Sequence, residues 1–171
     1  MKNNKNNIII VIIIVAIVAI ISITAYLFID KYNNRKIEMS QNEIEDYLDI
    51  NVASVEAETV EYFVEQKDVA GATYDKGEMT YTLKSSKNPQ KNLVNPEHNW
   101  GSNILMYCDV EDNKQIQVIS SLDEDDLSVM KAEWQDNGLY YGMYTENLTT
   151  REEFLLEVNK VVLDNHKRTS E

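Results

Sequence analysis

A nearly uninterrupted apolar run occurs once in the chain, over residues 8–29, and no charged residue lies within it. As a helix this run would be about 33 Å long, close to the ~30 Å hydrocarbon core of a bilayer. Backbone groups inside lipid must bond to one another, so this Ile- and Val-rich segment is expected to be helical. It is also longer than the apolar core of a cleaved signal peptide. The pattern predicts an uncleaved, single-pass transmembrane helix.

Two capping boxes mark the starts of helices in the remainder of the chain. They are formed by Ser40 with Glu43 and by Thr150 with Glu153. Apolar residues at helical spacing follow both boxes, which predicts helices over residues 41–55 and 150–166. Residues 56–67 fit either a continuation of the first helix or a strand. We favour the helix, with the chain turning at Gly71 or Gly77.

Alternation of apolar and polar residues predicts three strands, over residues 79–84, 104–110 and 115–118. The last two are joined by a short polar turn and should pair as a hairpin.

Residues 127–145 fit two structures. Asn137-Gly138 is a strong signal for a two-residue hairpin loop, and it would place Trp134 opposite Tyr141. The alternative is a helix over residues 123–136 that stops at the glycine. We favour the hairpin, because its register puts the apolar side chains of both strands on one face.

These elements predict an α+β fold, in which an antiparallel sheet is covered by a helix before it and by a C-terminal helix. The N-terminal transmembrane helix precedes this single domain. The predicted organisation is a short basic tail (1–7), the anchor (8–29), a juxtamembrane spacer (30–39), an acidic α+β domain (40–168) and a tail (169–171).

Charge is distributed unevenly. The whole chain has a formal charge of −13, yet its first 36 residues hold five bases and one acid. A strongly acidic body repels phosphate backbones, so we expect no nucleic-acid partner. The single cysteine, Cys108, excludes an internal disulfide and a Cys-rich zinc site. We expect it to be a small buried hydrophobe.

The sequence contains no catalytic motif, and we predict no catalytic residue, metal ligand or cofactor. His166 falls at the charged end of the last helix, where a solvated partner of the helix dipole is expected. Residues 123–126 are four consecutive acids, which could bind Ca²⁺ but lack the spacing of an EF-hand loop. We expect them to be a solvated loop or a helix start.

The segment 85–103 separates two predicted strands and contains both prolines, which indicates a long, non-regular loop. Its aromatic end either folds onto the core or forms a recognition tip. Aromatic side chains of the predicted hairpin would add to that surface and could stack on a sugar or anchor a protein. The candidate binding residues are His98, Asn99, Trp100, Tyr140 and Tyr144.

These patterns favour a non-enzymatic, single-pass protein of the bacterial cell membrane with an acidic extracytoplasmic binding or assembly domain. Basic residues flank both ends of the run 8–29, so the positive-inside rule does not decide its orientation. The short polar head and the scarcity of cysteine instead favour a body outside the cytoplasm. Its partners would be the membrane, through residues 8–29, and proteins or envelope components. Two alternatives are an anchored hydrolase of envelope polymers that uses paired carboxylates and a cytoplasm-facing accessory subunit of a membrane complex.

Overall fold

The computed structural model describes residues 14–27, 35–50, 55, 57–94, 97–110, 114–148 and 150–170. The chain divides into two compact units, Met1–Arg35 and Lys36–Glu171, which are described separately.

In the first unit, residues 14–27 form a helix inside the predicted apolar run. The hydroxyls of Ser22 and Thr24 each donate a hydrogen bond to the carbonyl four residues earlier, both at 2.8 Å. The predicted span also includes residues 8–13 and 28–29, which lie outside the described residues. Within the described part of the chain, no helix has both the length and the apolar character needed to cross a membrane.

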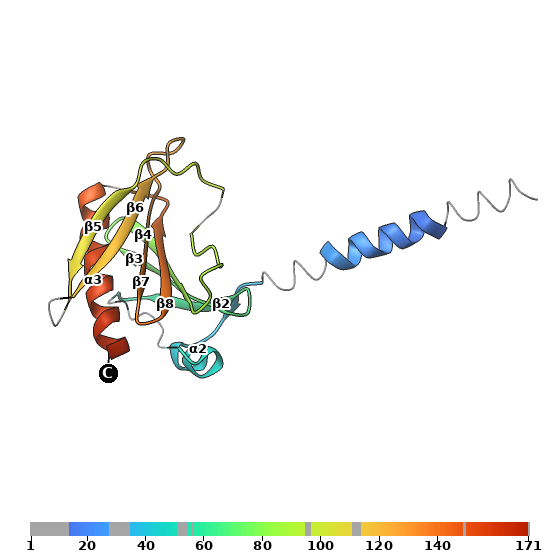
Figure 1. Cartoon of the computed structure of the whole chain (residues 1–171), viewed down its shortest axis with the longest axis horizontal. Coiled ribbons are helices and arrows are strands. Elements are labelled where there is room, and N and C mark those ends of the chain that lie inside the picture. The colour runs from blue at the N-terminus through green and yellow to red at the C-terminus, as the bar shows by residue number, and fades with distance from the viewer. Residues whose placement is uncertain are drawn as a thin grey trace, which may run out of the picture. The chain divides into compact units, whose positions relative to one another are not determined.

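The second unit is built on one eight-stranded sheet (Figure 1), in which every neighbouring pair is antiparallel. Its spatial order is β1-β2-β3-β4-β8-β7-β6-β5. The strands are β1 (Ile37–Glu38), β2 (Val60–Glu65), β3 (Val69–Lys76), β4 (Met79–Ser86), β5 (Ile104–Asp109), β6 (Gln115–Leu122), β7 (Met130–Asp136) and β8 (Leu139–Thr145). With the helices α2 (Gln41–Leu48) and α3 (Arg151–Ser170), this confirms the predicted α+β class and the C-terminal helix.

One face of the sheet, the inner face, is apolar and carries the core. Its residues come into register across the strands, and one such row contains Val64, Ala70, Ser85, Tyr141, Trp134 and Val118. Helix α3 adds its apolar stripe to the same core through Phe154, Val158, Val161 and Val162. Helix α2 contributes Ile44, which is fully buried. A salt bridge of 2.9 Å between Arg168 and Glu45 joins the two helices.

The opposite, outer face is covered only in places. Phe63 lies on Gly71 of the neighbouring strand, where a Cβ would come within 2.2 Å of its ring. The segment after β4 crosses β8 at Gly142, and a Cβ there would come within 2.6 Å of the Leu93 Cβ. Leu93 and Val94 are buried as a result. The predicted long loop therefore packs its middle onto the sheet.

Two sequence-based expectations are corrected at the start of this unit. Helix α2 keeps the predicted Ser40–Glu43 capping box but ends at Leu48, well before residue 55. Asp49 has a left-handed backbone with φ of 52°, which terminates the helix. Within residues 56–67, the favoured helix is also wrong, because β2 occupies most of that range.

The turn that follows β2 lies at Gln66 and Lys67, whose φ values are 52° and 67°. Gly71 lies inside β3, whereas Gly77 lies at the turn before β4 with φ of 63°. Of the two glycines expected to turn the chain, only Gly77 does so. At Gly71 the absence of a side chain instead makes room for the ring of Phe63.

Both predicted hairpins are confirmed. β5 pairs with β6, although residues 111–113 between them lie outside the described residues. β7 pairs with β8 through a two-residue loop in which Asn137 and Gly138 have φ values of 45° and 80°. Trp134 lies opposite Tyr141, as predicted. The alternative helix over residues 123–136 is wrong, because positive φ at both loop positions favours the type I′ hairpin turn.

The contact between Phe63 and Gly71 makes a first prediction. Gly71→Ala should lower the free energy of unfolding by about 1–3 kcal/mol, because the new methyl group displaces the ring. In a Phe63→Ala background the same change should be neutral or stabilising, since the ring is gone and alanine is less flexible than glycine. Urea denaturation of the four proteins measures the coupling. Equal effects of Gly71→Ala in both backgrounds would contradict the contact.

Candidate binding site

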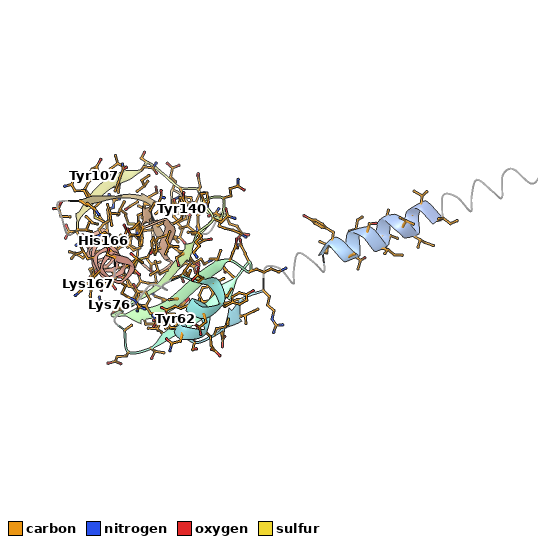
Figure 2. All side chains as sticks on the ribbon, turned by 60° about the horizontal axis from the view of Figure 1, so that its bottom comes forward. Tyr62, Lys76, Tyr107, Tyr140, His166 and Lys167 are labelled. Carbon is orange, nitrogen blue, oxygen red and sulfur yellow. The ribbon has the colours of Figure 1, made fainter. Side chains whose placement is uncertain are left out.

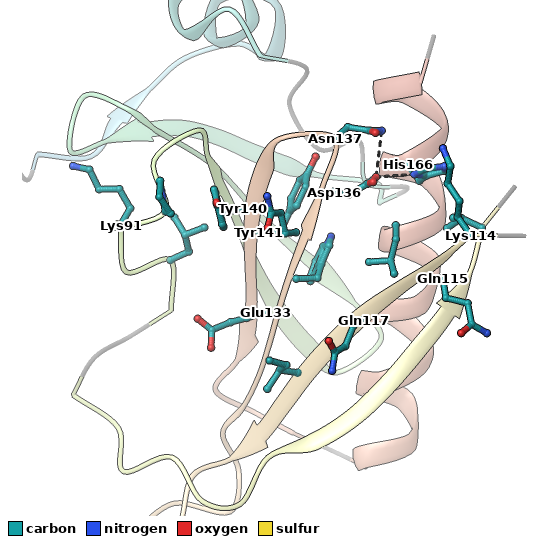
Figure 3. Close-up of a pocket in the computed structure, with 17 residues that line it drawn as sticks. Lys91, Lys114, Gln115, Gln117, Glu133, Asp136, Asn137, Tyr140, Tyr141 and His166 are labelled. Carbon is teal, nitrogen blue, oxygen red and sulfur yellow. Dashed lines mark hydrogen bonds and ion pairs between the residues drawn. The ribbon is translucent and has the colours of Figure 1, made fainter. Parts of the chain in front are cut away.

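A break in the sheet defines the candidate site. The ladder between β6 and β7 ends at the pair Val118–Trp134, whereas each strand continues its pairing with its other neighbour. Gln117 still pairs with β5, and Gln135 still pairs with β8. The hairpins β5–β6 and β7–β8 therefore diverge beyond Val118. The wedge between them is visible in Figure 3.

The wedge opens into a pocket of about 720 Å³. This volume lies within the ~300–1,000 Å³ of typical ligand sites. Gln115 and Gln117 come from β6, while Asp136, Asn137 and His166 gather at one end of the pocket (Figure 3). The segment over the outer face supplies a further wall, which includes Lys91 and Leu93. We call this cavity the inter-hairpin pocket.

Two aromatic rings from the inner face line the pocket. Trp134 and Tyr141 stack with their centroids 5.2 Å apart and their planes 7° from parallel. Their side chains are almost completely buried, at 5% and 1% exposure. Neither the Trp134 Nε1 nor the Tyr141 hydroxyl has a hydrogen-bond partner among the residues that the structure describes. Most buried polar groups are paired, so two unpaired atoms in one pocket point to a ligand or to bound water.

The Tyr141 hydroxyl stays protonated over the physiological pH range. Burial raises its pKa, and the nearby Asp136 carboxylate raises it further. The hydroxyl can therefore donate a hydrogen bond as well as accept one. The Trp134 indole can only donate. Each of the two groups is therefore a hydrogen-bond donor without an acceptor among the described residues.

The end of the pocket is formed by a buried acid–base pair. The His166 Nδ1 lies 2.8 Å from the Asp136 Oδ2, and both side chains are only 9% exposed. The expectation of a solvated His166 is thus wrong. Its position continues the buried stripe of α3, four residues after Val162 and eight after Val158. That helical spacing is the signal by which the sequence could have placed His166 inside.

Of the five predicted binding residues, only Tyr140 lines the inter-hairpin pocket. It projects from β8, whereas His166 comes from α3 (Figure 2). Tyr140 is half-buried and pairs with Gln135 across the β7–β8 ladder. Tyr144 lies four residues further along β8, on the same face, and borders a different hollow with Thr73 and Thr82.

The other three predicted residues lie at the opposite end of β6. Trp100 forms a β-bridge with Asp123, and the Lys131 ammonium lies 5.0 Å from the centre of its ring. The His98 ring lies 5.2 Å from that of Trp100, tilted by 50°, and its Nδ1 binds the Asp123 carboxylate. Asn99 is exposed, although its carbonyl accepts a hydrogen bond from the Glu124 backbone. The loop end is therefore fastened to the sheet and is not a projecting tip.

The acidic run 123–126 divides into one buried and three exposed residues. Asp123 is only 2% exposed, and its Oδ1 accepts hydrogen bonds from the backbone N–H groups of Asp125 and Asp126 at 2.7 and 3.1 Å. Burial would raise the pKa of Asp123, but these bonds and the one from His98 outweigh it and lower the pKa. The Asp123 carboxylate thus holds the backbone of the following loop residues in place. No group of three or more potential metal ligands occurs among the described residues.

Cys108 is buried, as predicted, with 1% exposure. Burial and the adjacent Asp109 raise the pKa of its thiol. A raised pKa disfavours the nucleophilic thiolate.

Comparison with known proteins adds no family to this description. No protein-family model, curated protein or solved structure matches the chain. The function is therefore argued from the residues themselves.

The buried pair at the end of the pocket makes a second prediction. His166→Ala should lower the free energy of unfolding by about 1–3 kcal/mol, because it leaves the buried Asp136 carboxylate with only the longer, 3.5 Å hydrogen bond from the Asn137 amide. Lys167→Ala changes an exposed neighbour on the same helix and should stay within about 0.5 kcal/mol of wild type. Urea denaturation of both variants provides the measurement. Equal free energies of unfolding for the two variants would contradict a buried His166.

Asp123 makes a third prediction, which concerns pH. Its lowered pKa means that the folded state favours the carboxylate, so its contribution is complete above its ordinary pKa of 3.8 and is lost as pH falls through the lowered value. Asp123→Asn should lower the urea midpoint at about pH 7 and have a smaller effect at about pH 2.5. Asp125→Asn, at an exposed neighbour, is the control. A difference that persists unchanged in acid would refute this role.

Proposed function

We propose that this protein is a single-pass membrane protein that holds a non-enzymatic binding domain at the outer face of the cell membrane. The anchor would be the run 8–29, and the binding site would be the inter-hairpin pocket. The observation that carries the binding function is the inter-hairpin pocket, two of whose lining residues, Trp134 and Tyr141, each have a buried polar atom without a partner among the described residues.

The anchor is supported by its composition and by local hydrogen bonding. The described part of the run, residues 14–27, is helical, and its side chains are almost entirely aliphatic. Two of its three hydroxyl residues, Ser22 and Thr24, bond back to helix carbonyls and so satisfy their own donors, and the third, Tyr26, lies near the end of the run. A helix that satisfies its polar groups internally suits the hydrocarbon region.

The charge of the folded unit supports a position beside the membrane and not on it. The chain beyond the first 36 residues holds 28 acids and 11 bases. Anionic headgroups repel such a body, whereas the basic residues Lys31, Arg35 and Lys36 follow the run 8–29 in the sequence and would be attracted to those headgroups.

The carboxylates of the pocket favour binding over hydrolysis. Paired-carboxylate hydrolysis requires two acids that flank one bond. Glu133 and Asp136 are three residues apart on β7 and therefore belong to opposite faces of the sheet. Each also has its own partner, Lys131 at 2.6 Å and His166 at 2.8 Å. This arrangement holds the charges in place and leaves neither acid facing the other.

The topology makes a fourth prediction. With an epitope at each end of the full chain, protease added to intact cells should remove the C-terminal epitope and leave the N-terminal one on a membrane-embedded fragment. The fragment should stay in the membrane pellet after alkaline carbonate washing. A cytoplasmic protein in the same cells controls for lysis.

Two results would reject the proposed function. Full protection of the C-terminal epitope until lysis would assign the folded unit to the cytoplasm and favour an accessory subunit. Recovery of the chain from the medium without the N-terminal epitope would show a cleaved leader in place of an anchor.

A further inference from the structure

We infer that the inter-hairpin pocket binds a short stretch of a neutral glycan, with one sugar ring against Tyr140 and its hydroxyl groups on the polar atoms of the pocket. This inference deepens the proposed binding function and rests on it. It follows from three features of the lining: charge pairing, neutral hydrogen-bonding groups and one accessible aromatic ring.

The charged residues of the lining are largely paired within the protein. The Lys91 ammonium lies 2.8 Å from the Asp68 carboxylate, outside the pocket. Glu133 binds Lys131 at 2.6 Å, and Asp136 binds His166 at 2.8 Å. Lys114 is exposed at the rim. A charged ligand would have to compete with these existing pairs, and an anion would also meet the net charge of −13.

The groups left for a ligand are mainly neutral. Gln117 and Gln135 are exposed amides from the two diverging strands, and each amide offers both donors and an acceptor. Trp134 Nε1 and Tyr141 OH add two unpartnered atoms from the buried side. A sugar hydroxyl donates one hydrogen bond and accepts two, so several hydroxyls on one ring match this mixture of donors and acceptors.

Tyr140 supplies the apolar surface that a sugar ring needs. It is half-buried, lines the pocket and stands beside Gln135 in the β7–β8 register. Leu93 of the crossing segment is buried in the same wall. Amphipathic tyrosine rings offer an apolar body with a polar tip. An extended peptide is the less suitable occupant, because strand addition needs a run of free backbone groups. Between the hairpins, β6 leaves only Gln115–Gln117 and β7 only Gln135–Asp136 without a neighbour on that side.

Fluorescence and calorimetry on the full chain in detergent micelles test the inference. Trp100→Phe leaves Trp134 as the only tryptophan, so its emission reports on the pocket. The neutral probes are tetramers of glucose and of N-acetylglucosamine. The comparison probes are the galacturonate tetramer, the glucosamine tetramer and a capped alanine–glycine tetrapeptide. At least one neutral sugar should change the emission saturably, with both charged sugars and the peptide about tenfold weaker or more.

Variants then assign the binding to the pocket. Tyr140→Ala should weaken binding of the neutral sugar by about tenfold in calorimetry, and Gln135→Ala by a smaller factor. Tyr144→Ala removes a tyrosine from the same face of the same strand, outside the pocket, and should leave affinity unchanged. Unchanged melting temperatures confirm that the variants are folded. Gln135 is exposed, so that variant remains informative if Tyr140→Ala unfolds.

The outcomes separate this inference from the proposed function. Absence of saturable binding by either neutral sugar, or binding that Tyr140→Ala and Gln135→Ala leave intact, overturns the glycan inference. Tyr140-dependent binding of the peptide or of a charged sugar overturns it too, but supports a binding role for the pocket. The location of the domain is judged separately by the protease experiment on intact cells.

Discussion

The register that Asn137 and Gly138 impose on β7 and β8 is the constraint on which the site depends. A two-residue loop with positive φ at both positions allows one pairing, and this pairing sets Trp134 opposite Tyr141. Side chains alternate between faces, so a slip of one residue would move both rings from the core to the outer face. The same alternation directs Asp136 toward α3 and Tyr140 toward the outer wall of the pocket. One turn thereby places residues on both sides of the sheet.

The pocket exists because the hairpins β5–β6 and β7–β8 separate at one end of the sheet, where β7 contacts α3 and β6 stays paired with β5. The end of β7 is tied to α3 by the pair of Asp136 with His166. The stack of Trp134 on Tyr141 lines the resulting wedge. A break of this kind exposes amides and leaves buried donors without protein partners. It gives the proposed binding domain the neutral, polar lining on which the glycan inference rests, and the proposed anchor would hold that lining at the cell surface.

Much of the fold was predictable from local signals. The capping residues, the alternating strands and the Asn-Gly turn specify elements whose stability comes from near neighbours in the chain, and the structure confirms them. Predictions failed where distant contacts decided. Residues 60–65 have a pattern that suits both helix and strand, and pairing with β3 selects the strand. The helix α2 ends early because Asp49 adopts a left-handed conformation. Glycine is the usual residue at such a position, so the sequence contained no recognisable stop signal there. Of the site, Tyr140 and the facing of Trp134 with Tyr141 were predicted, whereas the pocket itself was not.

The sequence by itself determined the apolar run of residues 8–29, the acidic character of the remainder and the register of the β7–β8 hairpin. Each follows from composition or from interactions between residues close in the chain. Only the tertiary structure decided that His166 is buried against Asp136, that Trp100 is fastened beside Asp123 and that β6 separates from β7. The residues concerned lie from 16 positions apart, for Val118 and Trp134, to 30 positions apart, for Asp136 and His166. Their geometry depends on how the sheet, the crossing segment and α3 pack together, and no short stretch of sequence encodes that packing.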